Sequence, residues 1–196
     1  MIVVLCHPAR EQVASPPPGP TIILHDTFTA SDDTLLVNHV MEVGPGWQTV
    51  SGGGGKIVSN KAVNASGNTV VASQANQADA VITADVTSVD AGVWDLVGRL
   101  TDTPVFWLLE IYQPSGTIAL YEFNGSFIER ASVSFSSTLG ETYAMKLEFN
   151  GTSIKGFVNG TEYISYTSSV NQQATKHGIR LHASNMNTDN FKATTL

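Results

Sequence analysis

The sequence predicts an all-β protein, an antiparallel two-sheet β-sandwich that follows an extended N-terminal arm. Hydrophobic and polar residues alternate along several segments, so that each segment has one dry and one wet face. Asn-Gly pairs and other glycine-rich breaks separate these segments. Charged residues make up only 14% of the chain, and Thr, Ser, Asn and Gly take their place, as is typical of strands joined by many turns.

Three segments alternate strictly and are predicted to be strands, namely 81–86, 143–149 and 179–183. A fourth segment begins at Trp94, where Trp94, Leu96 and Leu100 are expected on the buried face and Asp95 and Arg99 on the opposite face. A strand that is dry on one face and wet on the other fits the outer surface of a sandwich.

Residues 105–112 are apolar on both faces, which predicts a central strand that is covered on both sides. Asn124-Gly125, Asn150-Gly151 and Asn159-Gly160 supply the positive φ angles of tight hairpins. Only residues 31–41 are a candidate helix.

The domain boundary is expected at Thr21, with an arm and Pro-rich linker at 1–20 and the sandwich at 21–196. A single domain suits a chain of 196 residues. Pro16 to Pro20 reads as a stiff polyproline-type spacer. The apolar run at the start is too short for a signal peptide and has no basic residue before it, so none is expected.

The net charge of −7 and the scattered basic residues exclude nucleic acid and anionic membrane surfaces as expected partners. No segment approaches the roughly 20 apolar residues of a membrane span. Cys6 is the single cysteine, so no intrachain disulfide can form.

Short motifs occur in a characteristic order along the chain: Asp26-Thr-Phe28, Leu35-Leu36, His39, Gly44, Trp47, Ile57, Asn60-Lys-Ala62, Tyr143 to Leu147, Asn150-Gly151, Phe157 to Gly160, Gly178 to Leu181 and Asp189-Asn-Phe191. In this order they resemble the concanavalin A-like/laminin-G-like jelly-roll module of bacteriophage structural proteins and bacterial surface proteins. The resemblance covers residues 26–193, and it implies that the first and last strands lie side by side.

No catalytic residue is predicted. Glycoside hydrolysis, the obvious chemistry for this fold, needs two carboxylates on either side of the bond, yet Glu110 and Glu122 each stand alone on their strands. There is also no Gly-x-Ser-x-Gly elbow.

No metal site and no cofactor is predicted either. The five histidines lack ligand spacing. Calcium is left open without named ligands, because the aspartates that could bind it are spread out: Asp79, Asp85, Asp90, Asp102 and Asp189.

Aromatic side chains are the candidates for stacking on sugar rings. Trp94 and Trp107 alternate with aliphatic residues and are expected in the core. Tyr112 and Tyr121 remain as candidate glycan contacts.

The resemblance and the missing active site favour a non-enzymatic structural component of a phage-like virion, such as a capsid decoration, head-fibre or tail-associated protein. Ile2, Val3, Val4 and Leu5 would anchor it to other virion proteins in a larger assembly by β-augmentation. The expected localisation is the virion, after synthesis in the host cytoplasm. The alternative is a carbohydrate-binding, lectin-like adhesion module that attaches to host-surface glycans.

Overall fold

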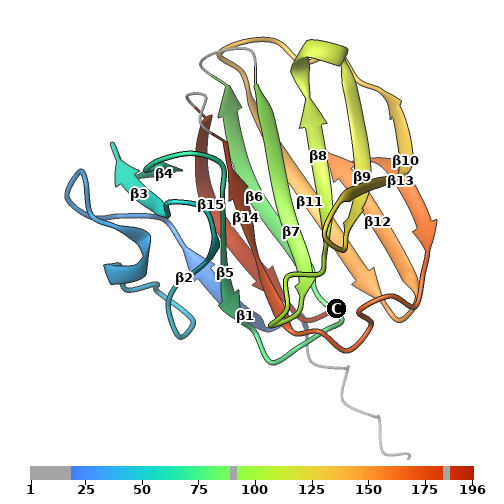
Figure 1. Cartoon of the computed structure of the whole chain (residues 1–196), viewed down its shortest axis with the longest axis horizontal. Helices are drawn as coiled ribbons and strands as arrows, with labels where there is room; N and C mark the ends of the chain where they lie inside the picture. Colours follow the sequence, from blue (N-terminus) through green and yellow to red (C-terminus); the bar gives the residue numbers. More distant parts are fainter. Residues whose placement is uncertain (1–18, 89–91, 183–185) are drawn as a thin grey trace, which may run out of the picture.

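In the computed structural model, residues 19–88, 92–182 and 186–196 are described, and they form two antiparallel sheets packed face to face (Figure 1). The first sheet contains, in spatial order, β13 (Thr161–Thr167), β12 (Ser153–Val158), β11 (Thr142–Asn150), β6 (Val81–Ser88), β15 (Met186–Thr194), β4 (Lys61–Asn64) and β3 (Gly55–Val58), with β1 (Ile22–Asp26) paired to β15. The second contains β10 (Phe127–Ser134), β9 (Thr117–Phe123), β8 (Phe106–Tyr112), β7 (Val93–Leu100), β14 (Lys176–Leu181), β5 (Thr69–Gln74) and β2 (Gln48–Ser51).

The predicted all-β sandwich is therefore confirmed, and so is the side-by-side placement of the first and last strands. Asp26 on β1 pairs with Phe191 on β15. The three Asn-Gly pairs connect β9 to β10, β11 to β12 and β12 to β13, and Gly125, Gly151 and Gly160 all have positive φ.

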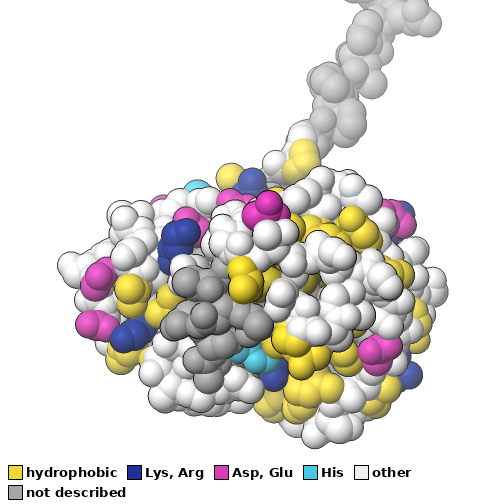
Figure 2. Space-filling view, turned by 90° about the horizontal axis from the view of Figure 1, so that it is seen from above, with side chains coloured by type: hydrophobic (Ala, Val, Ile, Leu, Met, Phe, Trp, Pro, Cys, Tyr) yellow, Lys and Arg dark blue, Asp and Glu magenta, His cyan; other side chains and the backbone are white. Residues whose placement is uncertain are grey.

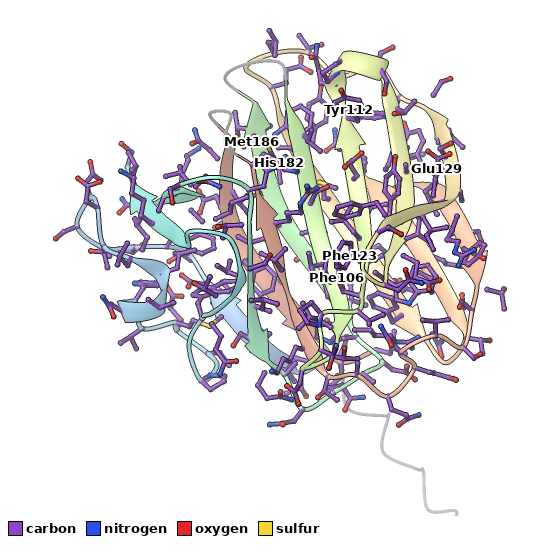
Figure 3. All side chains as sticks on the ribbon, viewed as in Figure 1. Phe106, Tyr112, Phe123, Glu129, His182 and Met186 are labelled. Atoms are coloured by element: carbon purple, nitrogen blue, oxygen red, sulfur yellow. The ribbon has the colours of Figure 1, made fainter. Side chains whose placement is uncertain are left out.

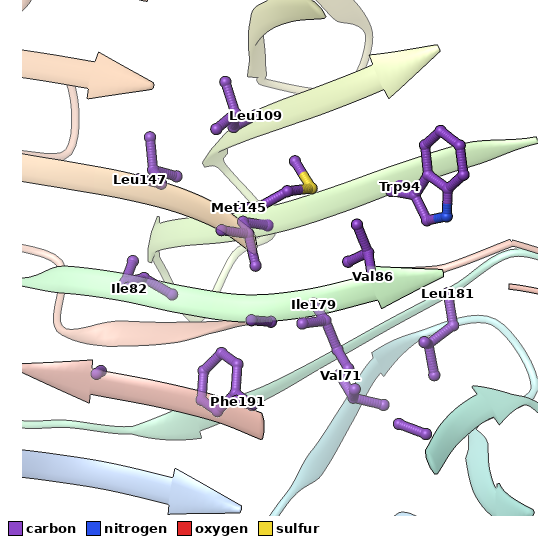
Figure 4. Close-up of a cluster of buried hydrophobic side chains, with 14 of the residues drawn as sticks. Val71, Ile82, Val86, Trp94, Leu109, Met145, Leu147, Ile179, Leu181 and Phe191 are labelled. Carbon is purple, nitrogen blue, oxygen red and sulfur yellow. The ribbon is translucent and has the colours of Figure 1, made fainter. Parts of the chain in front are cut away.

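The core lies between the sheets and is built from the inward positions of the alternating strands (Figure 4). Trp94 and Trp107 are fully buried, as expected from their aliphatic neighbours. The predicted central strand is β8, which has neighbours on both sides and buries Phe106 and Leu108 on one face and Trp107 and Leu109 on the other.

Two local expectations were wrong. Residues 31–41 form a loop with one short 3-10 turn, Leu36–Asn38 (η1), because backbone bonds such as Ile57 N to Thr34 O tie this loop to β3 instead. At the end of β7, Arg99 has a φ of 48°, which shifts the alternation by one residue. Leu100 therefore lies in the outer cluster of the sheet, and Arg99 is buried under the Phe149 ring.

The second short 3-10 turn, Gln113–Ser115 (η2), joins β8 to β9. None of the helical turns in the described ranges has the length and hydropathy to cross a membrane.

Candidate functional site

A polar cluster lies on the outer face of the seven-stranded sheet, across the adjacent strands β8, β7 and β14. Asp95 on β7 pairs in register with Glu110 on β8 and with Arg180 on β14. The neighbours of these residues along each strand point into the core, so their own side chains point out to the opposite face. His182 follows β14 and reaches the same cluster.

Asp95 is the centre of this cluster. Its side chain has no exposed surface, and its Oδ2 atom lies 3.1 Å from Nη1 of Arg180 and 2.6 Å from Nε2 of His182. The same Arg180 nitrogen lies 3.9 Å from Oε2 of Glu110. The other oxygen of Asp95, Oδ1, is buried and has no hydrogen-bond partner within the described residues. Arg180 therefore holds two neighbouring carboxyl groups together.

Burial, the largest cause, and the nearby Asp95 together raise the pKa of Glu110 to about 8, against the opposing effect of Arg180. At neutral pH the Glu110 carboxyl is therefore mostly protonated. A protonated carboxyl can donate one hydrogen bond and accept others, which suits a partner that carries hydroxyl groups.

Two hollows adjoin this cluster, and Phe127 and Arg180 line both of them. The polar hollow has a volume of about 330 Å³ and is lined by Val93, Glu110, Tyr112, Tyr121, Phe127, Arg180 and His182. The apolar hollow has a volume of about 300 Å³ and is lined by Ser51, Asn68, Val70, Pro104, Phe106, Phe123, Phe127 and Arg180. Figure 3 shows Phe106 and Phe123 close together, at the start of β8 and the end of β9, and Tyr112 at the far end of β8. Glu129 lies on β10, and His182 follows β14.

Aromatic side chains form a wall along these hollows. Phe106 and Phe123 stack with their ring centroids 4.8 Å apart, and Phe127 lies 4.8 Å from Phe123 and 6.2 Å from Tyr121. The Arg180 guanidinium lies over the Phe127 ring at 4.7 Å. Phe127 and Tyr112 remain 43% and 39% exposed, so their surfaces are open to a ligand.

The candidate glycan contacts predicted from the sequence, Tyr112 and Tyr121, thus line the same hollow. The Tyr121 hydroxyl donates a hydrogen bond to Oε2 of Glu129. The pKa of Tyr121 is raised to about 12, mainly by burial. That Tyr112 and Tyr121 contact a glycan stays a prediction. The predicted partner-binding arm, Ile2, Val3, Val4 and Leu5, lies outside the described residues.

Sequence reasoning missed Asp95, Arg180, His182 and Phe127, and it wrongly treated Glu110 as an isolated acid. The carboxylate partner of Glu110 stands on the neighbouring strand rather than on its own, and the linear pattern does not show that relationship. The signal that could have found the pair is the hairpin register of segments 94–100 and 105–112. Once these two strands are paired antiparallel, one register places Asp95 opposite Glu110.

Three of these residues could hold a metal ion. One ligand atom each from Asp95, Glu110 and His182 lies within 4.8 Å of the other two. In this arrangement, however, the Arg180 guanidinium already brings positive charge to both carboxyl groups. A divalent cation would have to compete with it, so the residues present fit an organic ligand better than a metal.

Some of the aspartates considered for calcium have other partners. Asp79 pairs with Arg99, Asp102 with Lys176, and Asp85 accepts a hydrogen bond from Asn190. A wider hollow, of about 590 Å³, opens between β5 and the loop before β14, but its lining is mainly amide and hydroxyl groups without an aromatic ring. It therefore lacks the aromatic side chains and the paired carboxyl groups that distinguish the site on the seven-stranded sheet.

The fold is shared with proteins of known structure. The carbohydrate binding module CBM66 from Bacillus subtilis has a TM-score of 0.59 and 18% identity, over 76% of this chain and 91% of that module. Caenorhabditis elegans galectin LEC-6 has a TM-score of 0.51 and 15% identity, over 64% and 88%. The Bacillus licheniformis β-glucanase has a TM-score of 0.58 and 12% identity, over 92% and 100%.

No protein-family model matches the sequence, and the comparison with curated proteins finds no match. At these identities the likeness to solved structures establishes the galectin-like, concanavalin A-like jelly-roll fold. Proteins of this fold include both binding modules and glycoside hydrolases.

Proposed function

We propose that this protein is a non-catalytic carbohydrate-binding module and that its site is the outer face of the seven-stranded sheet. One observation carries the proposal. In the polar hollow, the aromatic rings of Tyr112, Tyr121 and Phe127 lie beside the hydrogen-bonding groups of Glu110, Arg180 and His182. Sugars present apolar C–H faces and hydroxyl edges, so this pairing of surfaces suits them. The carbohydrate-binding module and the galectin among the similar structures support the same choice.

The geometry of the paired acids favours binding over hydrolysis. A glycosidase needs two carboxyl groups that both reach the scissile bond. The Asp95 side chain has no exposed surface, and its Oδ2 atom is already engaged by Arg180 and His182. Asp95 therefore serves to position Arg180 and His182, while Glu110 lines the hollow that the ligand would enter.

The charge around the site favours a neutral sugar. Asp95 is paired with Arg180, Glu110 is mostly protonated at neutral pH, and Glu129 adds a carboxylate beside the hollow. The whole chain carries a formal charge of −7, and the face seen in Figure 2 shows no continuous basic stripe. A sialylated, sulfated or uronic-acid glycan would be repelled by Glu129 and by the negative charge of the chain.

A glycan array followed by titration tests the proposal, with two matched variants. Phe127→Ala removes a ring that lies under Arg180 in the site, whereas Phe157→Ala removes a ring that lies under Lys146 on the opposite sheet. We expect saturable binding to neutral glycans, which falls at least about tenfold in Phe127→Ala and is retained in Phe157→Ala. A uniform background across all glycan classes would overturn the proposed function.

A further inference from the structure

The apolar hollow differs in chemistry from the polar hollow that it adjoins. Val70, Pro104, Phe106, Phe123 and Phe127 form most of its lining. The polar residues in the lining are Ser51, Asn68 and Arg180, and Arg180 is shared with the polar hollow. A ligand that crosses from one hollow to the other therefore passes from hydrogen-bonding groups to a hydrocarbon surface.

This hydrocarbon surface belongs to a second hydrophobic cluster, which lies outside the sandwich core. Its buried members are Val70, Ala72, Val97, Leu100, Phe106 and Leu108, and Phe123 and Tyr121 pack against them. These side chains lie on the outer face of the sheet, where a one-sided sheet would normally carry polar residues. The cluster provides an apolar floor for the hollow at the surface.

A sugar ring alone would be a poor occupant of this second hollow. Each hydroxyl that leaves water needs a hydrogen-bond partner, and an unpaired one costs about 1–3 kcal/mol. Phe106, Phe123, Val70 and Pro104 offer no side-chain partner, which leaves Ser51, Asn68 and Arg180 as the lining side chains that could pair with the hydroxyl groups of a whole ring. The volume of about 300 Å³ is more space than a single methyl group fills.

We infer that the apolar hollow binds a hydrocarbon aglycone, of about the size of a phenyl ring, on a neutral sugar whose ring lies in the polar hollow. This inference rests on the proposed function. Phe127 and Arg180 line both hollows. The glycosidic oxygen, which joins the sugar to the aglycone, would therefore lie beside these two residues. Phe123 and Phe106 would contact the aglycone, and Glu110 and His182 the sugar hydroxyls.

Matched glycosides test this inference by NMR titration of the whole chain. The probes are the methyl and phenyl β-glycopyranosides of glucose, galactose and mannose, together with methyl β-N-acetylglucosaminide. For the sugar that binds, we expect the phenyl glycoside to bind on the order of tenfold more tightly than the methyl glycoside. The signals of Phe106 and Phe123 should shift with the phenyl glycoside and not with the methyl glycoside.

Two variants sharpen the test. In Phe123→Ala the ratio of the two affinities should fall toward one, whereas in Phe157→Ala, on the opposite sheet, it should stay as in the wild type. Equal affinities for the methyl and phenyl glycosides would overturn the aglycone inference and leave the proposed function standing. Binding of none of the probes, together with a negative array, would overturn both.

Discussion

Asp95 on β7 and Glu110 on β8 face each other across paired strands, and one nitrogen of Arg180 lies 3.1 Å from the first carboxyl group and 3.9 Å from the second. The Asp95 side chain is fully buried, and those of Glu110 and Arg180 are each 13% exposed. Two acidic groups in such a setting repel each other unless one is protonated or a cation lies between them. Here Glu110 is mostly protonated at neutral pH, and the Arg180 guanidinium lies beside both carboxyl groups. Each of these two features leads to a prediction.

Removal of the cation should destabilise the fold. Arg180→Met keeps much of the side-chain length but leaves Asp95 buried without its guanidinium, so we expect the free energy of unfolding to fall by about 2–4 kcal/mol. Urea denaturation measures this change. Lys155→Met is the control, because Lys155 and Glu162 form a surface pair whose loss should leave the stability nearly unchanged. Equal effects of the two variants would contradict the central role of Arg180.

The raised pKa of Glu110 predicts that stability depends on pH. Between the ordinary value of 4.5 and about 8, the unfolded chain loses the proton while the folded protein keeps it. The contribution of Glu110 is therefore fully present below about pH 4.5 and is lost as the pH rises to about 8. The loss should not exceed about 5 kcal/mol, the linkage limit for such a shift.

Glu110→Gln should remove this dependence, because the amide does not titrate. The measurement is urea denaturation of both proteins at pH 5, 6, 7 and 8, and the quantity of interest is the difference between them. We expect the variant to gain stability relative to the wild type at each step upward. A difference that stays constant with pH would show that Glu110 titrates normally.

The residues that carry the family resemblance turn out to hold the fold together. Asp26 accepts hydrogen bonds from the Trp47 indole and the Phe28 backbone N–H, each at 2.6 Å, and His39 Nε2 lies 3.0 Å away. Trp47 also packs against the rings of Phe28 and Phe191. Asp26, Trp47 and Phe191 thus join the first strand, a loop and the last strand. Because these matching residues are structural, they predict the fold well and the function poorly.

Asp26→Ala should therefore be strongly destabilising, by about 2–4 kcal/mol, because it leaves buried donors without an acceptor. A double-mutant cycle with Trp47→Phe should give a coupling energy of about 1 kcal/mol or more. Asp33→Ala removes a carboxylate from an exposed pair with Lys56 and should stay within about 1 kcal/mol of the wild type. Additive effects of Asp26→Ala and Trp47→Phe would show that their hydrogen bond contributes little.

Local pattern was enough to predict five of the strands, the Asn-Gly hairpins and the burial of Trp94 and Trp107, because alternation and turn chemistry depend on near neighbours. The candidate site was not predictable in this way. Asp95, Glu110 and Arg180 meet only through the pairing of three strands, and a change of register by one residue would point one of them into the core. The positive φ of Arg99 shifted the pattern in the same way, and no residue type signals it.

His177 gives a prediction on the acid side of neutrality. It is fully buried and stacks on Phe149, its Nδ1 accepts a hydrogen bond from the Arg99 backbone N–H, and its Nε2 lies 2.8 Å from the Gln77 carbonyl oxygen. Nε2 therefore carries the proton, and the ring is neutral. Burial, the largest cause, and the charge of Arg99 together lower its pKa to about 4, against the opposing effect of the Gln77 hydrogen bond.

The sign of this effect is opposite to that of Glu110. Between the ordinary value of 6.5 and about 4 the unfolded chain binds a proton that the folded protein does not, so this contribution is present above pH 6.5 and lost as the pH falls toward 4. The loss is limited to about 3.4 kcal/mol. In His177→Gln, which should lower stability at pH 7, this dependence should vanish, and chemical denaturation at pH 7, 6, 5 and 4 measures it. If the wild type and the variant lost stability in parallel over this range, His177 would have to be charged in the folded state.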